Sequence, residues 1–166
     1  MHPQTPHLKG FVYIKTLCQI LWADLMSRII LHTHGKIKNK PLNSLIQMYM
    51  ERMASESIKL IHHSEALLPD EYLQKITKIS EKSELLLFDI TGSKMNSIHF
   101  SNLVKSWKLS SRSIHLAIGP AIGFPENNFQ KISLSDLTLP NEVALMVLVE
   151  QIYRSFQIIK GTKYHK

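Results

Sequence analysis

The chain has 166 residues, a formal net charge of +7 and a sequence isoelectric point near 9.5. This length suffices for one domain with a sizeable core, and a single cysteine, Cys18, excludes an internal disulfide and fits a reducing compartment. No run approaches the ~20 apolar residues of a membrane span. The basic charge favours a polyanionic partner such as nucleic acid, because clustered lysine and arginine release counterions from phosphates; a merely solvated surface is the alternative.

The first 25 residues differ in character from the rest of the chain. Residues 11–25 are apolar enough to suggest a signal peptide, but Lys15 and Gln19 interrupt them and no small-residue cleavage site follows. We therefore expect residues 1–25 to be an N-terminal extension and residues 26–166 to form a single domain, with Met26 as the natural start.

Apolar residues follow strand-like and helix-like spacings in alternation along the domain. Strands are expected at residues 28–33, 57–63, 84–90 and 113–118, with a short one beginning near residue 132, and helices at about 42–54, 69–82, 97–108 and 141–159. A basic loop, GKIKNKP, follows the first strand, and a turn is expected at residues 91–93. Such alternation predicts an α/β fold in which helices cover a mainly parallel sheet.

Ligands of such sheets bind outside the carboxyl ends of the strands. Three loops of this chain qualify: the one after Phe88, residues 119–123 and residues 135–140. The second reads GPAIG, which lacks the glycine spacing and the Lys-Ser/Thr ending of a phosphate-binding loop. By itself it predicts only a flexible turn.

Nine histidines raise the question of a metal site. His32 and His34 would share one face of a strand, and His62 and His63 form a doublet, but no cysteine or carboxylate lies nearby at the spacing of zinc ligands. We therefore expect no metal.

Residues 132–166 combine a short apolar strand, a polar loop closed by Pro140, a helix that is apolar on nearly every face, and a basic tail. Such a helix must be covered by other structure or by a partner chain. Glu150 and Arg154 lie one helical turn apart and can form an ion pair. The tail ends in Tyr164, His165 and Lys166; such ends are usually solvated, but this one could also stack on a base and bind phosphate.

Taken together, several segments closely resemble the ribosomal RNA large subunit methyltransferase H family, which are minimal SPOUT methyltransferases. The C-terminal block is the most specific part, with ISLSDLTLP, VEQIYRSFQIIKG and the terminal YHK. The resemblance continues through HGKIKNK, FDITGS, WKLSSR and IGPAIGF and covers roughly residues 26–166.

This resemblance implies a SPOUT-type mainly parallel sheet with a C-terminal trefoil knot, a rare exception to chain-threading rules. It implies a cytoplasmic homodimer, without membrane or metal, that uses S-adenosyl-L-methionine to methylate N3 of a pseudouridine in large-subunit (23S) ribosomal RNA. Carried over by position, the cofactor-binding residues are Phe88, Gly119, Leu134, Ser135, Asp136, Leu137, Thr138 and Leu139.

The same resemblance places the acceptor side of the reaction at the tail. Methyl transfer depends on positioning of the acceptor nitrogen, and the N3 proton must leave. His165 or a solvent path is the candidate general base, while Arg154 and Tyr164 are expected to face the RNA with Glu150 orienting Arg154. His165, Arg154 and Tyr164 are therefore the candidate catalytic residues.

A few positions depart from the family pattern. Phe88 replaces the usual leucine, Pro120 stands where glycine usually follows Gly119, and Asn141 and Leu145 stand where histidine and arginine are usual. Pro120 removes a backbone donor and stiffens the loop. Two alternatives stay open: a non-catalytic RNA-binding or ribosome-associated protein of this fold, and a SPOUT methyltransferase of another RNA.

Overall fold

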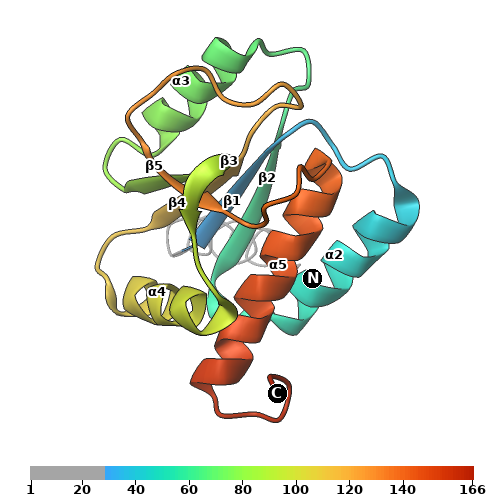
Figure 1. The fold of residues 1–166 in the computed structure, drawn as a ribbon, viewed down its shortest axis with the longest axis vertical. Coiled ribbons are helices and arrows are strands. Elements are labelled where there is room, and N and C mark those ends of the chain that lie inside the picture. The colour runs from blue at the N-terminus through green and yellow to red at the C-terminus, as the bar shows by residue number, and fades with distance from the viewer. Residues whose placement is uncertain (1–28) are drawn as a thin grey trace, which may run out of the picture.

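The computed structural model describes residues 29–166; the expected extension and Met26 lie outside the described residues. Strands and helices alternate along the described chain, as the sequence predicted (Figure 1). In chain order they are β1 (Ile29–His34), α2 (Lys40–Arg52), the 3-10 turn η1 (Ala54–Glu56), β2 (Ile58–His63), α3 (Pro69–Ile79), β3 (Glu84–Lys94), α4 (Ser97–Leu109), β4 (Ile114–Ile118), β5 (Gln130–Ser133) and α5 (Asn141–Ile159).

The described strands form one five-stranded sheet in the order β2-β1-β4-β3-β5, and every neighbouring pair is parallel. β4 lies between β1 and β3, so the strand order departs from the chain order at the middle of the sheet. The carboxyl ends of all these strands meet at one edge. The predicted α/β class with a parallel sheet is confirmed.

Helices cover both faces of the sheet. Neighbouring residues of a strand point to opposite faces, so apolar residues in succession must be covered on both sides. Leu86 and Leu116 belong to a large apolar core with residues of α2, α4 and α5, whereas the adjacent Leu87 and Ala117 pack with α3. The first half of β3 is thus covered on both faces, which explains its nearly continuous apolar run.

Helix α5 has the bounds that its apolar pattern predicted. It runs along the sheet between α2 and α4 (Figure 1), and its buried side chains include Leu145, Leu148, Ile152 and Phe156. The sheet, α2 and α4 therefore supply much of the cover that an apolar helix requires. None of the helices formed by residues 29–166 is both long enough and apolar enough to cross a bilayer.

The turn predicted at residues 91–93 is wrong, because β3 continues through them. Phe88 and Ser93 both pair with Ile132 of β5, so the residues between them bulge out of the ladder. A Cβ atom added to Gly92 would lie 2.5 Å from the backbone N and C atoms of Ile132. Glycine therefore marks a close approach of two backbones here, and the sequence signal was misread as a turn.

Candidate functional site

A cavity of about 260 Å³ lies at the carboxyl edge of the sheet. Its walls come from the middle of β3, the loop after β4, the loop between β5 and α5, and the first residues of α5. This volume is close to the lower end of the roughly 300–1,000 Å³ that small-molecule sites occupy. Two of the three loops predicted to bind a ligand, residues 119–123 and residues 135–140, therefore surround one cavity. The loop expected after Phe88 is wrong, because β3 continues through these residues and the strand itself forms that wall.

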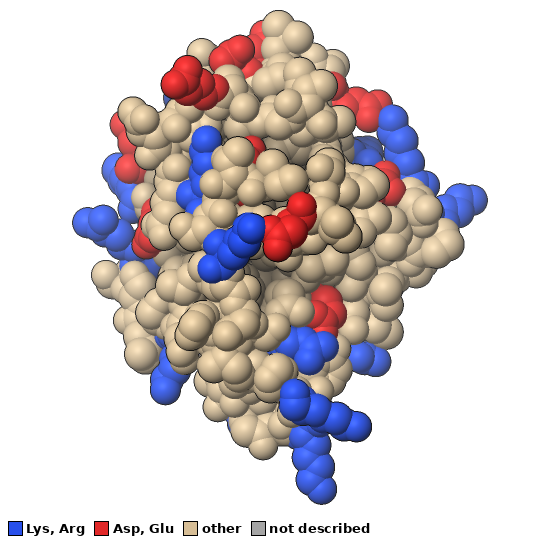
Figure 2. Space-filling view, viewed as in Figure 1, with Lys and Arg blue, Asp and Glu red and all other residues tan. Residues whose placement is uncertain are grey.

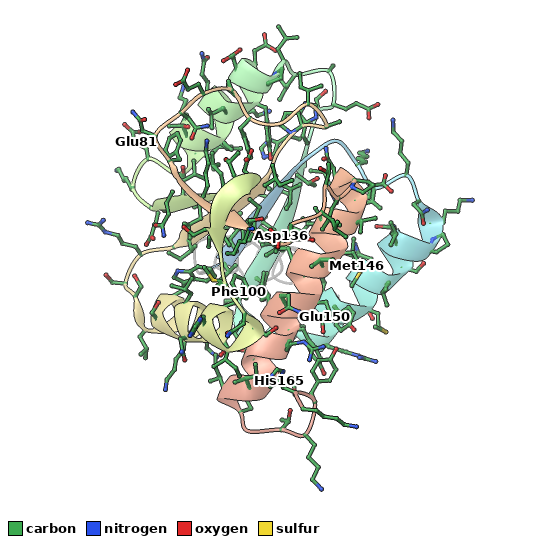
Figure 3. All side chains as sticks on the ribbon, viewed as in Figure 1. Glu81, Phe100, Asp136, Met146, Glu150 and His165 are labelled. Carbon is green, nitrogen blue, oxygen red and sulfur yellow. The ribbon has the colours of Figure 1, made fainter. Side chains whose placement is uncertain are left out.

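The residues predicted to hold a cofactor line this cavity, with the exception of Asp136; they are Phe88, Gly119, Leu134, Ser135, Leu137, Thr138 and Leu139. The Asp136 carboxylate instead forms an ion pair with Lys94 at the end of β3. In Figure 3, Asp136 lies beside the first turns of α5. The loop that carries it is therefore at the cavity, while its side chain is engaged elsewhere.

The cavity also includes residues that sequence reasoning did not single out, notably Asp89, Phe124 and Ala144. Asp89 accepts hydrogen bonds from the backbone N and the Oγ1 of Thr91, at 2.9 and 2.7 Å. Burial alone would raise the pKa of Asp89, but these bonds and the charge of Lys131 lower it below its ordinary value. Asp89 thus presents an ionised carboxylate that can accept from hydroxyl or ammonium groups.

The loop after β4 is held in place by an aromatic pair. A Cβ atom on Gly119 would lie 3.0 Å from the ring of Phe124, which stacks on Tyr72 of α3 with 6.0 Å between ring centroids. The Tyr72 hydroxyl donates to the carbonyl of Ile118 over 3.0 Å, and burial raises the pKa of this phenol. The backbone at Gly119 can therefore face the cavity without an intervening side chain.

The loop from residue 134 to residue 139 is held by hydrogen bonds of two serines, one at the end of β5 and one in the loop. The Ser133 hydroxyl donates to the carbonyl of Ser135 over 2.8 Å, and the Ser135 hydroxyl accepts from the Leu137 amide over 3.0 Å. Leu137 is 73% exposed, and Ile122 on the facing loop is 84% exposed. The rim of the cavity therefore carries apolar side chains that the described chain leaves uncovered.

The three candidate catalytic side chains gather around Glu150. Arg154 donates to Oε1 of Glu150 from Nη2 and Nε, at 2.6 and 3.0 Å, so the predicted ion pair is present. Tyr164 donates to the same oxygen over 3.0 Å, and Nδ1 of His165 lies 3.4 Å from Nη1 of Arg154. The bond from Arg154 to Glu150 raises the pKa of the guanidinium.

Two further tyrosines belong to this tail cluster. The Tyr49 hydroxyl of α2 lies 3.1 Å from that of Tyr164, and because Tyr164 donates to Glu150, Tyr49 is the donor between the two phenols. Tyr153 packs edge-on against the Tyr164 ring, with 5.0 Å between centroids. Burial and then the bonds with Tyr49 and Glu150 raise the pKa of Tyr164, so it stays a neutral donor.

The cavity and the tail cluster lie toward opposite ends of α5. Ala144 lines the cavity, whereas Arg154 belongs to the cluster, and at ~1.5 Å per residue about 15 Å of helix separates them. Figure 3 shows Asp136 near one end of this helix and His165 near the other. Within the described chain the structure does not bring the two sets of predicted residues together.

The histidines of the sheet form a row. Nδ1 and Nε2 of His32 lie 2.8 Å from Nε2 of His63 and 2.8 Å from Nδ1 of His115, and the three side chains are buried. Burial, followed by the two neighbouring imidazoles, lowers the pKa of His32 to about 3. In residues 29–166 no group of three or more His, Cys, Asp or Glu side chains is arranged to hold a metal ion.

The departures from the family pattern fall in different surroundings. Pro120 and Asn141 line the cavity, so they bear directly on what it can bind. Leu145 is fully buried in the main core, where an arginine would leave an unpaired charge in apolar surroundings. The leucine thus fits the packing of this chain.

Comparisons with known proteins identify relatives of this chain. The family model described as "Predicted SPOUT methyltransferase" matches residues 27–165. The ribosomal RNA large subunit methyltransferase H of Malacoplasma penetrans is 33% identical over 149 residues, covering 80% of this chain and 95% of that protein. Proteins of the same name from Acetivibrio thermocellus and Enterococcus faecalis are 30% and 32% identical over 158 residues, covering 84% of this chain and 99% of each relative.

Proposed function

The chain belongs to the SPOUT methyltransferase family, and from this premise we propose that it methylates N3 of a pseudouridine in large-subunit (23S) ribosomal RNA, with S-adenosyl-L-methionine as the methyl donor. The observation that carries the proposal is the cavity that two of the predicted ligand-binding loops, residues 119–123 and 135–140, form together with Phe88 and its neighbours in β3. The names of the relatives support large-subunit ribosomal RNA as the substrate. The proposal places the enzyme in the cytoplasm.

The residues of the cavity suit this cofactor. Apolar walls such as Phe88 and Leu134 can cover an adenine, whose polar edge would meet the backbone groups of the loops. The ionised carboxylate of Asp89 can accept from ribose hydroxyls or from the ammonium group. When bound, the cofactor supplies an electrophilic sulfonium methyl group. We include in the proposal the trefoil knot through which the loop at residues 134–139 would be threaded.

The proposed enzyme is a homodimer, because one protomer holds the two halves of the site too far apart. Reacting atoms must approach to about 3–3.5 Å, whereas about 15 Å of α5 separates Ala144 from Arg154. A second copy can bring its tail cluster to the cavity of the first. The exposed Ile122 and Leu137 at the cavity rim support such a contact, since apolar side chains gain by being covered.

In this arrangement the chain's own side chains position the acceptor base. Arg154 is a fixed cation suited to a phosphate. Tyr164 is a neutral donor whose one proton goes to Glu150, so it can donate to a carbonyl oxygen of the base only after that bond opens. Arginine can only donate, so Nδ1 of His165 accepts from Arg154 and the proton of a neutral His165 is on Nε2. For His165 to take the N3 proton at Nδ1, the 3.4 Å contact with Arg154 must open.

Two measurements test the proposal. Calorimetry with S-adenosyl-L-methionine asks whether the purified protein binds the cofactor; absence of binding would favour a non-catalytic RNA-binding protein. Transfer of labelled methyl groups to ribosomes with and without pseudouridine tests the acceptor. We expect labelling only when pseudouridine is present, whereas equal labelling of both would refute the acceptor and point to another RNA position.

A further inference from the structure

Two lysines lie on the loop that joins β1 to α2, and a third is the first residue of α2. Lys36, Lys38 and Lys40 are all exposed. Lys38 forms a 2.8 Å ion pair with Glu65, but both side chains are more than half exposed, so water and salt screen this pair and phosphate can replace the carboxylate at little cost. Among residues 29–166, Lys36 and Lys40 form no ion pair. Figure 2 shows lysine and arginine side chains projecting at the edge where, in Figure 1, β1 leads into α2.

The loop is attached to α5 by one carboxylate. Glu142, in the first turn of α5, accepts from the backbone amide of Lys38 over 2.6 Å and from that of Asn39 over 3.2 Å. The Asn39 side chain in turn accepts from the Leu42 amide over 3.0 Å and caps α2. The carboxylate of Glu142 therefore fixes the path of the backbone, and the lysine side chains remain directed to solvent.

This attachment places the lysines beside a second hollow. The hollow has a volume of about 600 Å³ and lies between Asn39 and Leu42 on one side and Ala121 with residues 138–143 on the other. Ala121 and Asn141 also line the cofactor cavity, so the two spaces share a wall. A nucleotide in the second hollow would lie next to the cofactor, and the phosphates beside it would meet the lysine loop.

We propose that residues 36–40 form a phosphate-binding surface for the RNA substrate and that Glu142 is the positioning residue that holds this surface at the second hollow. The inference rests on the proposed function, since it assigns the acceptor side of the same site. Glu142 carries a negative charge and would by charge alone repel RNA. The contribution of Glu142 is to fix the loop. Removing its carboxylate should therefore weaken RNA binding, although the removal makes the surface more basic.

The lysine surface is tested by the salt dependence of RNA binding. The double variant Lys36→Ala/Lys40→Ala is compared with Lys78→Ala/Lys82→Ala, which removes the same charge from exposed positions on and after α3, on the opposite face of the sheet. The probe is large-subunit ribosomal RNA transcribed in vitro. Each lysine that no longer neutralises a phosphate should lower the slope of log affinity against log salt by about 0.7–0.9.

We expect a slope lower by about 1 to 2 in the loop variant only, with binding of S-adenosyl-L-methionine unchanged in both. An unchanged slope, or an equal change in the α3 control, overturns the lysine surface while leaving the proposed function intact. If the wild-type protein binds neither the RNA nor the cofactor, the proposed function itself fails and the inference fails with it. Melting temperatures confirm that each variant is folded.

The role of Glu142 is tested by Glu142→Ala and Glu142→Gln. If Glu142 positions the loop, Glu142→Ala should raise the KM for RNA several-fold with a smaller effect on kcat and on cofactor affinity. Glutamine keeps one acceptor oxygen for a backbone amide, so Glu142→Gln should recover much of the loss. Tighter RNA binding by Glu142→Ala would show that its charge alone matters and would overturn the positioning role.

Discussion

Tyr164 donates a 3.0 Å hydrogen bond to Oε1 of Glu150, the same oxygen that accepts twice from Arg154. One carboxylate on α5 thus holds a tyrosine of the tail and an arginine of the helix side by side. His165 follows directly in the chain and reaches the other side of the same guanidinium. The geometry of the tail depends on this one acceptor.

Tyr164→Phe is expected to lower methyl transfer by roughly ten- to a hundredfold, because a hydrogen bond to a charged group contributes about 1.5–3 kcal/mol. The ring keeps its packing on Tyr153, but the lost bond should also lower the melting temperature by several degrees, so the rates are compared at a temperature at which both proteins are folded. Tyr153→Phe is the matched control, since its hydroxyl forms no hydrogen bond with residues 29–166. Single-turnover assays decide the matter: equal rates for the two variants would remove Tyr164 from the site.

Gly92→Ala is expected to destabilise the fold strongly. The new Cβ would lie 2.5 Å from backbone atoms of Ile132, which cannot move without breaking the pairing of β3 with β5. We expect a loss on the order of 3 kcal/mol or more in the free energy of unfolding, measured with urea. Ser93→Ala, at the next position along β3, should change it by less than about 0.5 kcal/mol. Wild-type stability in Gly92→Ala would contradict the close approach.

Gly119→Ala should act on the cavity more than on the fold. Its Cβ would lie 3.0 Å from the Phe124 ring, a side chain that can shift by a few tenths of an ångström. We expect the affinity for S-adenosyl-L-methionine to fall by about tenfold, which corresponds to about 1.4 kcal/mol. Calorimetry measures it, with urea unfolding as the check on stability. Unchanged affinity would exclude Gly119 from the cofactor site.

The histidine row makes a prediction about acid stability. Burial lowers the folded-state pKa of His32 to about 3, and burial also lowers those of His63 and His115. In the unfolded chain a histidine binds its proton near pH 6.5. Below about pH 6.5 the unfolded chain therefore binds more protons than the folded protein. The three neutral histidines contribute fully to the free energy of unfolding above about pH 6.5, and this contribution is lost as the pH falls toward about 3.

His32→Gln should therefore reduce the slope of unfolding free energy against pH within that window, measured by urea titrations at a series of pH values. The variant also loses a buried hydrogen bond, so its stability at pH 8 should be lower, and the slope is the informative quantity. His99→Gln, at an exposed position of α4, serves as the control and should leave the slope as in wild type. Equal slopes in all three proteins would contradict the prediction.

Features set by local pattern were predictable from the sequence. The bounds of α5 follow from an apolar run after Pro140. The alternation of strand-like and helix-like spacing of apolar residues along the chain predicts the parallel sheet. Because carboxyl ends of parallel strands meet at one edge, the sequence pattern alone sufficed to group Phe88 with the loop at Gly119, although Phe88 lies within β3 and no loop follows it directly. The resemblance of the C-terminal block identified the family, which the comparisons confirm.

Only the tertiary structure decided which distant residues act together. The bond of Tyr49 with Tyr164, the attachment of the Lys38 amide to Glu142 and the row through His32 join positions far apart in the chain, and no local spacing encodes them. Gly92 was misread for the same reason, since the backbone it approaches belongs to another strand. By itself the sequence determined most of the elements and the family; packing determined how the tail and the lysine loop are held, because contacts between separate elements arise only when the sheet and its helices assemble.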